Sequence, residues 1–277
     1  MALFRYFDRN GCLTLENLNL KVTPPNDFDD PFEFSPVVKT QDLRASAEKR
    51  IDALLATPSF LPKVKARFPH IATLKDMQAL AAPGKQKDAL IDMMAPELPA
   101  LDLDFQKEVQ DILSRTLGVI CFTSEPKNPL MWALYADKHK GMVIEFDPAH
   151  RLFNANPEFI KVDYSPNRAT YDPGDSQHNM VEALAKRKSP QWTYQKESRL
   201  IVELRNTTTA NVNGKTVQLL PIEAAAIKAV TLGVRADSAL ETEVRSALKN
   251  PDLKHVTFHR MTMSPDLFEF VPIDLVV

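Results

Sequence analysis

Glycine is scarce in this sequence. The 277 residues include 7 glycines and 21 prolines, whereas average usage would give about 19 glycines and about 14 prolines. No two glycines lie within three residues of each other. This spacing excludes the G-x-G-x-x-G turn of dinucleotide-binding folds and the G-x-x-x-x-G-K-[ST] phosphate loop, because both need closely spaced glycines. The same scarcity disfavours collagen, glycine-rich linkers and a barrel of tightly turned strands.

An excess of either charge is also missing. The formal net charge is -2, which gives no bulk attraction to nucleic acid or to an anionic membrane, so only a local basic patch could provide one. The two cysteines, Cys12 and Cys121, have no metal-ligand spacing and are too few for a disulfide framework. We expect reduced thiols, with a single bridge as the less favoured alternative.

Long apolar runs are absent as well. No run approaches the roughly 18 residues that cross a membrane, and the opening MALFRYFDRN is too short, and too polar after Phe7, for a signal peptide. We therefore expect a cytoplasmic protein without a membrane partner. Apolar residues make up 44% of the chain and charged residues 25%, proportions that are ordinary for a globular protein with a sizeable core.

Residues 1–277 are predicted to form a single α+β domain, within which 41–117 form a helical insertion or lobe. In that segment apolar residues recur at helical spacing, as at Leu43, Ala47 and Ile51, and prolines mark the expected helix boundaries. Residues 2–40 contain an apolar start and a proline-rich turn, which predict strands and turns.

From Leu117 onward, short apolar segments predict a series of β-strands. They lie at 119–122, 142–146, 159–164, 200–204, 229–232, 255–261 and 268–273. Helices are predicted between them at 179–188 and 238–249. Some strands follow one another without an intervening helix, which favours a mixed, mostly antiparallel split sheet of short strands over a parallel sheet.

Two candidate metal sites are not supported by local geometry. His255 and His259 have the spacing of a zinc pair, but the residues between them are typical of a strand, which would separate the rings by roughly 13 Å. Asp29 and Asp30 lie beside Glu33, yet adjacent residues point apart and Asp before proline commonly begins a turn. We expect structural histidines, a turn and no metal.

Three stretches combine aromatic, polar and charged residues densely: 28–33, 121–146 and 188–200. In the second stretch, Met131, Trp132, Leu134 and Tyr135 have the spacing of the core face of one helix, or of a binding surface. The third stretch contains Glu197. Its carboxylate is either one member of a surface pair with Arg199 or an acid with a perturbed pKa among aromatic rings.

These stretches resemble a family of uncharacterised bacterial proteins, domain of unknown function 2971. The family pattern includes Phe-Asn-Asp-Pro-Phe, Met-Trp-x-x-Tyr-Ala-x-x-His-x-Gly and Trp-x-Tyr-Glu-x-Glu-x-Arg, which correspond to 28–32, 131–141 and 192–199. The resemblance spans most of the chain outside the helical middle. The chain departs from the family pattern at three places. The residues that begin at Arg5 differ from the usual Lys-Tyr-Arg-like start, Asp29 stands where Asn is typical, and Gln195 replaces the first Glu.

The order of three short motifs is similar to that of ADP-ribosyltransferases of the Arg/Ser/Glu type. Those enzymes carry an Arg on an early strand, a Ser-Thr-Ser-like strand end and a late Glu or Gln-x-Glu pair. Here Arg5, then Thr123 and Ser124, then Gln195 and Glu197 follow in that order. The resemblance implies an enzyme that consumes NAD as a co-substrate, without a metal. A transferase cleft of this kind binds NAD through strand-end side chains and a split sheet, so scarce glycine does not exclude it.

The transferase resemblance also implies a role for each residue. Glu197 would stabilise the positive charge that develops on the ribose as the bond to nicotinamide breaks, and Gln195 would orient the acceptor. Arg5 would clamp the phosphates of NAD. The remaining implied contacts are to the ribose from Thr123 or Ser124, and to the nicotinamide ring from Tyr6, Trp132 or Tyr135. Further candidates from the same stretches are His139, Trp192, Tyr194 and Arg199.

Two other functions remain open on the sequence alone. The first is a non-enzymatic sensor whose aromatic residues hold a nucleotide or peptide. The second is an RNA-processing enzyme that uses Lys138, His139 and Lys140 on a phosphate backbone, although these residues also suit a solvated helix end capped by Gly141. As an NAD-consuming enzyme, the protein would be a toxin or an anti-phage effector with a protein or nucleic-acid acceptor. The sequence does not fix its oligomeric state.

Overall fold

The computed structural model describes residues 2–38, 107, 109–154, 156–171, 177–212 and 214–276. The chain divides into two compact units, of which the first, here called the main unit, consists of 1–35, 110–169 and 176–277. The second consists of 36–109 and 170–175. Its described part includes strands β3 (Val37–Val38) and β8 (Thr170–Tyr171), which pair in parallel.

Most of the predicted helical lobe at 41–117 lies outside the described residues. Residues 107 and 109–116 are helical, and Leu117 already begins a strand. Among the helices that the structure describes, none combines the length and the apolar character needed to cross a membrane.

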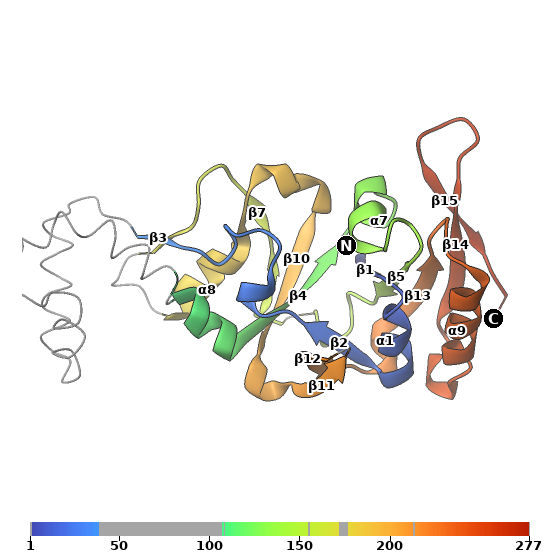
Figure 1. Cartoon of the computed structure of the whole chain (residues 1–277), viewed down its shortest axis with the longest axis horizontal. Helices are drawn as coiled ribbons and strands as arrows, with labels where there is room; N and C mark the ends of the chain where they lie inside the picture. Colours follow the sequence, from blue (N-terminus) through green and yellow to red (C-terminus); the bar gives the residue numbers. More distant parts are fainter. Residues whose placement is uncertain are drawn as a thin grey trace, which may run out of the picture. The chain divides into compact units, whose positions relative to one another are not determined.

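The main unit is built on an eight-stranded sheet with the order β15-β14-β13-β5-β1-β4-β10-β6 (Figure 1). Of these neighbours β13 and β14 are parallel and the others antiparallel, which confirms the predicted α+β class with a mixed, mostly antiparallel sheet. The strands are β1 (Leu3–Phe7), β4 (Leu117–Thr123), β5 (Met142–Phe146), β6 (Phe159–Lys161), β10 (Glu197–Glu203), β13 (Ile227–Leu232), β14 (Thr257–Met263) and β15 (Phe270–Asp274).

The sheet is split between β1 and β4. These neighbours share a single residue pair, Phe4 opposite Thr123. Farther along β4, Val119 exchanges both backbone hydrogen bonds with Thr23, which follows β2 (Asn19–Val22). The middle of β4, around Cys121, therefore lies between two points of attachment, and the two halves of the sheet diverge there.

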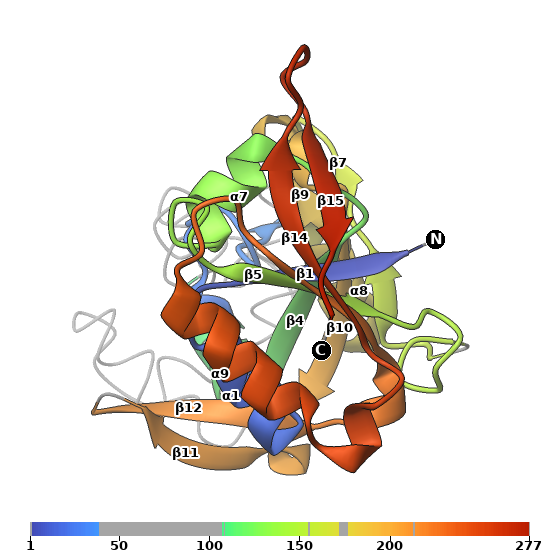
Figure 2. The ribbon, with the colours of Figure 1, turned by 90° about the vertical axis from the view of Figure 1, so that its right-hand side faces the viewer.

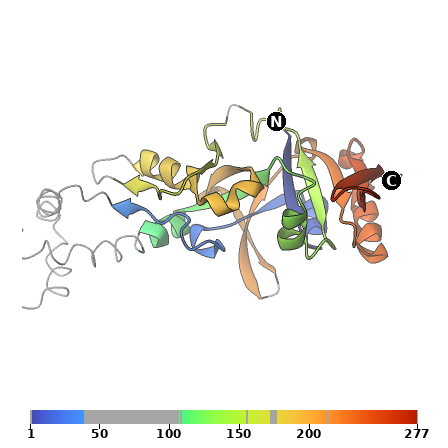
Figure 3. The same ribbon diagram turned by 90° about the horizontal axis from the view of Figure 1, so that it is seen from above.

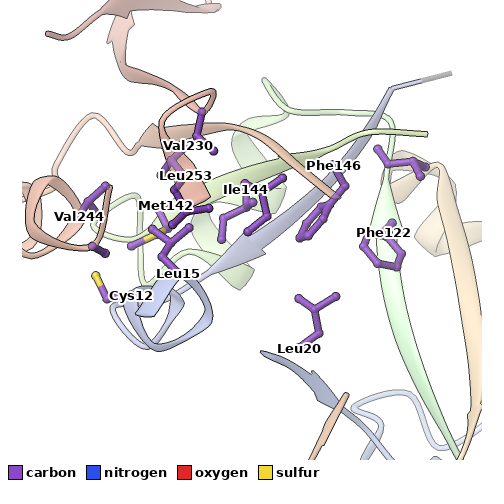
Figure 4. Packing of buried hydrophobic residues seen from close by; sticks show 14 of the residues in the cluster. Cys12, Leu15, Leu20, Phe122, Met142, Ile144, Phe146, Val230, Val244 and Leu253 are labelled. Carbon is purple, nitrogen blue, oxygen red and sulfur yellow. The ribbon is translucent and has the colours of Figure 1, made fainter. Parts of the chain in front are cut away.

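The two faces of the sheet are covered by different helices. Alternate residues of β5 show this, because Met142, Ile144 and Phe146 belong to the larger core cluster whereas Val143 belongs to a second cluster. The larger cluster packs against α1 (Gly11–Asn17) and α9 (Ser238–Leu248), which lie side by side in Figure 2. Figure 4 shows Cys12 and Leu15 of α1 among the side chains of this cluster.

The second face carries α7 (Pro129–Tyr135), whose start follows from its sequence. Asn128 accepts hydrogen bonds from the backbone nitrogens of Leu130 and Met131, and Pro129 occupies the first turn. Met131 and Trp132 are buried, as expected of a core face, but Leu134 is 59% exposed, so the interpretation of Leu134 as a core residue is wrong. A seven-residue helix spans barely two turns and presents a narrow buried stripe.

The turn after α7 uses left-handed residues that are not glycine. Asp137, Lys138 and His139 have φ values of 44°, 54° and 71°. Gly141 is required for space, because a Cβ there would lie 2.0 Å from the carbonyl oxygen of Phe7. The expected glycine cap is thus replaced by a strained turn that ends directly at β5.

Two further features differ from the sequence prediction. Residues 11–17, predicted as strand and turn, form helix α1, which the alternating Leu13 and Leu15 obscure. The hairpin of β11 (Thr208–Val212) and β12 (Lys215–Pro221) was not predicted, because its residues are polar or half-exposed. It joins β2 in a separate three-stranded sheet and extends away from the main sheet (Figure 3).

The remaining elements are short. Helix α8 (Gln177–Lys186) corresponds to the helix predicted at 179–188. Strand β7 (Asp163–Tyr164) pairs in parallel with β9 (Arg187–Lys188). The 3-10 helices are η1 (Pro25–Asp27), η3 (Pro190–Gln195), η4 (Leu204–Asn206), η5 (Ala224–Ala226) and η6 (Pro251–Leu253).

Candidate functional site

A cleft of about 340 Å³ opens at the split between β1 and β4. Its walls come from β1, the middle and end of β4, the start of β10, helix α7, turn η3 and the loop that follows β2. This volume lies in the lower part of the range for small-molecule sites. The split therefore holds the candidate site.

Seven of the predicted site residues line this cleft: Arg5, Tyr6, Thr123, Tyr135, Trp192, Gln195 and Glu197. They come together because β1, β4 and β10 are neighbours in the sheet. Thr123 lies opposite both Phe4 of β1 and Glu197 of β10, so the three motifs that are far apart in the sequence meet at one strand end.

The other five predicted residues do not line the cleft. The backbone nitrogen of Ser124 donates to the carbonyl of Lys196. Of the two alternatives for the hydroxyl, Thr123 lines the cleft and Ser124 does not. Trp132 is buried behind the wall, where its indole N–H donates to the carbonyl of Pro126 at 2.9 Å. The expected stacking of Trp132 on a ligand is therefore replaced by an edge contact with Tyr6, at 5.2 Å between ring centroids.

His139, Tyr194 and Arg199 likewise have partners within the protein. His139 contacts the ring of Phe270, and Tyr194 lies against Trp192. Lys138 and Lys140 flank His139 in the left-handed turn, away from the cleft lining. Arg199 is fully buried behind the cleft, where it donates to Glu197 and Glu33, two residues that line it.

Four charged side chains form one cluster, here called the charge quartet: Glu33, Lys188 and Glu197 at the floor of the cleft and Arg199 directly behind them. Arg199 Nε donates to Glu197 Oε1 at 2.7 Å, and Lys188 Nζ donates to Glu197 Oε2 at 2.7 Å. Lys188 Nζ also lies 2.8 Å from Glu33 Oε1, and Arg199 Nη2 donates to Glu33 Oε2. All four side chains are at most 7% exposed. Two cations and two carboxylates thus form a closed ring.

The two carboxylates of the charge quartet differ in pKa. Burial alone would raise the pKa of Glu197, but Arg199 and Lys188 outweigh it and lower that pKa to about 2. At Glu33 burial prevails over the same two cations, and its pKa is raised from 4.5. Burial would lower the pKa of Lys188, yet Glu197 and Glu33 raise it. Near neutral pH Glu197 is therefore an anion held by two cations.

Arg5 forms the opposite wall and is differently placed. Its Nη2 donates to the carbonyl of Lys21 at 3.0 Å, which ties β1 to β2 across the split. Its Nη1 is buried and has no hydrogen-bond partner among the residues that the structure describes. Burial lowers the pKa of Arg5 to about 10, so the guanidinium is still charged at neutral pH. An anion such as phosphate in the cleft would complete its hydrogen bonds.

A network of uncharged groups holds the end of the cleft. Thr123 Oγ1 donates to the carbonyl of Gln195 and accepts from the backbone nitrogen of Glu125. Gln195 Nε2 donates to the hydroxyl of Tyr135 at 2.7 Å, and the hydroxyl of Tyr6 donates to the carbonyl of Glu125 at 2.6 Å. These bonds fix the side chains at this end of the cleft.

Sequence reasoning missed Glu33 and Lys188. Both lie in the dense stretches, and Glu33 was considered only as part of an acidic cluster. The structure uses Glu33 in ion pairs, and Asp30 accepts from the backbone nitrogen of Phe32. Within the described ranges, no group of His, Cys, Asp and Glu is arranged to hold a metal ion. The sequence signal that could have identified Lys188 is a charged residue close to aromatic residues, here Trp192.

The two histidines of the candidate zinc pair have separate partners. His255 Nε2 contacts the carbonyl of Ile227 at 2.9 Å, and His259 Nδ1 contacts Asp274 Oδ1 at 2.9 Å. His259 Nε2 also contacts the hydroxyl of Thr257. Each ring is therefore held by its own neighbours on the sheet.

The structure is that of an α+β protein with a cleft at the split in its main sheet. Residues 131–200 match the model of the family described as "Protein of unknown function (DUF2971)". The match runs from α7 into β10 and confirms the family resemblance for the motifs at 131–141 and 192–199; the motif at 28–32 lies outside it. No curated protein and no solved structure matches the chain.

Proposed function

We propose that this protein is an ADP-ribosyltransferase-like enzyme that consumes NAD. The observation that carries the proposal is the meeting of Arg5, Thr123 and Glu197 in one cleft at a split in the sheet. These residues represent the three motifs of the Arg/Ser/Glu type, in the same order along the chain, on three neighbouring strands. Thr123 here supplies the hydroxyl in place of Ser124.

The chemistry asks for a positive wall for phosphates and a negative group near the ribose. Breaking the bond between the ribose C1′ and the nicotinamide nitrogen leaves the electron pair on nicotinamide and positive charge on the sugar. A fixed carboxylate stabilises that charge. Water or an acceptor side chain then bonds to C1′ and loses a proton.

The residues of the cleft divide these tasks. The buried guanidinium of Arg5 binds phosphate, and the hydroxyl of Thr123 contacts the ribose next to Glu197. Tyr135 and Tyr6 flank the nicotinamide ring. Gln195 is fixed by Tyr135 and orients the acceptor.

A nicotinamide-release assay tests the proposal. Purified protein is incubated with NAD, alone and with cell lysate, and free nicotinamide and labelled ADP-ribose adducts are measured. We expect release by the wild type and a loss of at least about a hundredfold in Glu197→Gln, the scale of removing one transition-state contact. Glu203→Gln, on the exposed end of the same strand, is the matched control. Equal release by wild type and Glu197→Gln, or none from either, would exclude the reaction.

A second candidate function is a nucleotide sensor that binds without turnover. The observation in its favour is that both oxygens of Glu197 already accept hydrogen bonds from Lys188 and Arg199. A sensor would be stabilised by ADP-ribose in thermal unfolding without releasing nicotinamide from NAD. It would also keep its affinity after Glu197→Gln.

The proposed enzyme would act in the bacterial cytoplasm as a toxin or an anti-phage effector. The supporting argument is chemical, because NAD consumption or modification of an essential protein or nucleic acid stops growth. Induced expression in a bacterium should arrest growth for the wild type and not for Glu197→Gln. Growth arrest by both would show that the toxicity does not depend on this carboxylate.

A further inference from the structure

Lys188 belongs to the charge quartet and also lines the cleft. Its ammonium group contacts two carboxylates, Glu33 and Glu197, and lies 5.3 Å from the ring centroid of Trp192. Glu33, Lys188, Trp192 and Glu197 all line the cleft, whereas Arg199 does not. Of the two cations in the charge quartet, Lys188 is therefore the one that a molecule in the cleft would contact.

The hydrogen-bonding capacity of Glu197 is largely used within the protein. An ionised carboxylate offers about four acceptor positions. Arg199 Nε occupies Oε1, while Lys188 Nζ and, at 3.3 Å, Arg199 Nη2 occupy Oε2. The side chain of Glu197 is 4% exposed, so water does not supply further donors. A ribose hydroxyl would need the place of one of these donors.

Arg199 cannot leave, because it is held on every side. Its Nη1 donates to the carbonyl of Ala185 and its Nη2 to Glu33, and its guanidinium lies over the rings of Phe28 and Phe34. Lys188 can leave Glu197 and still keep Glu33 and the face of Trp192. Its flexible stem and three rotatable donors allow such a shift without a change in the backbone.

We propose that Lys188 gates Glu197: it covers the carboxylate in the free protein and moves onto Glu33 when a ligand hydroxyl takes its place. The inference deepens the proposed function and rests on it, because the hydroxyl concerned belongs to the ribose that carries nicotinamide in NAD. Glu33 is then a positioning residue, since it acts by holding the displaced ammonium group.

The test compares two ligands that differ by this ribose. Dissociation constants of ADP-ribose and ADP are measured by calorimetry for the wild type, Lys188→Met and Glu33→Gln, and the ratio of the two affinities is reported. In Lys188→Met the preference for ADP-ribose over ADP should rise about tenfold, the scale of one bond to a charged group. In Glu33→Gln, where the ammonium loses its second carboxylate, the preference should fall by a similar factor.

The two variants distinguish a gate from a simple change of charge. Lys188→Met makes the cleft more negative and Glu33→Gln makes it more positive, so Coulombic attraction predicts that the affinity for ADP-ribose itself falls in Lys188→Met and rises in Glu33→Gln, whereas a gate predicts the reverse. ADP, which carries the larger negative charge near neutral pH, shows the Coulombic effect without the ribose, and circular dichroism reports folding. If Lys188→Met fails to fold, Glu33→Gln still decides the matter.

The outcomes are separable from those of the proposed function. If the wild type binds neither ADP-ribose nor ADP, the proposed function fails and the gate with it. If both ligands bind and the ratio is unchanged, or the affinity for ADP-ribose itself shifts in the Coulombic direction, the gate alone is overturned.

Discussion

Two arginines beside the cleft differ in their surroundings: Arg199 is fully buried behind it, and Arg5 is half-buried in its wall. Arg199 donates to two carboxylates and a carbonyl and lies over two aromatic rings. Arg5 donates to one carbonyl and has a buried nitrogen without a partner in the described part of the chain. The pKa of Arg199 is raised by its carboxylates, although burial opposes this, and that of Arg5 is lowered by burial.

The difference separates a structural cation from a ligand-binding one. A buried charge is tolerated when the protein supplies its partners, and it is costly when they are missing. The floor around Arg199 is complete without a ligand, whereas the wall around Arg5 is not. Three predictions test this contrast.

The largest effect is expected from Arg199→Met. The change leaves Glu33 and Glu197 buried with Lys188 as their remaining cation, and breaking a buried ion pair costs about 3–5 kcal/mol. Urea denaturation should show a decrease of that size in the free energy of unfolding. Arg205→Met, at an exposed position just after β10, is the control and should change it by less than about 0.5 kcal/mol. A loss below about 1 kcal/mol in Arg199→Met would contradict the structural role.

The second prediction concerns acid. The pKa of Glu197 is about 2 in the folded protein and 4.5 ordinarily, so its contribution, roughly 3 kcal/mol at most, is present above pH 4.5 and is lost as the pH falls towards 2. The raised pKa of Glu33 acts in the opposite sense: its contribution is present below pH 4.5 and is lost as the pH rises through the folded value.

Glu33→Gln removes the opposing contribution. The free energy of unfolding of the wild type should therefore fall relative to that of this variant as the pH rises above 4.5, whereas the two should change in parallel between pH 4.5 and 2, as measured by urea denaturation at several pH values. Glu203→Gln provides a comparison at an exposed carboxylate of β10. A difference between wild type and Glu33→Gln that stays constant above pH 4.5 would contradict this account of the charge quartet.

The smallest change in stability is expected from Arg5→Met. Because this guanidinium lacks a full set of partners, the substitution should alter the free energy of unfolding by less than about 1 kcal/mol. The stabilisation by ADP should fall instead. At a concentration of about 100 times the wild-type Kd it is about 2.7 kcal/mol for the wild type, and a tenfold weaker affinity reduces it to about 1.4 kcal/mol. A variant as unstable as Arg199→Met, with unchanged ADP binding, would remove the contrast between the two arginines.

Local pattern was sufficient for elements with a clear apolar signal. The strand predicted at 142–146 coincides with β5, because a short apolar run between turn residues has few alternatives. Helix α1 was missed because it is only seven residues long and its Asn10 makes no side-chain capping bond, so neither periodicity nor a cap marks it.

The candidate site was predictable in part, for a similar reason. Arg5, Thr123 and Glu197 belong to motifs whose order could be compared with that of a known enzyme type. The contact of Glu33 with Lys188 could not be predicted, since the two residues are distant in sequence and only the folded chain brings them together. The choice between Thr123 and Ser124 depended on which face of the strand end points to the cleft.

The single residue pair between β1 and β4 has a mechanical consequence. Strands β6, β10 and β4 form one half of the sheet and the five strands from β1 to β15 form the other, joined directly at Phe4 and Thr123. A ligand that contacts both Arg5 and Glu197 would act as a cross-link between the halves, in place of the ladder that the strands do not form. Such a ligand would restrict the motion of one half of the sheet relative to the other, including strands that it does not contact.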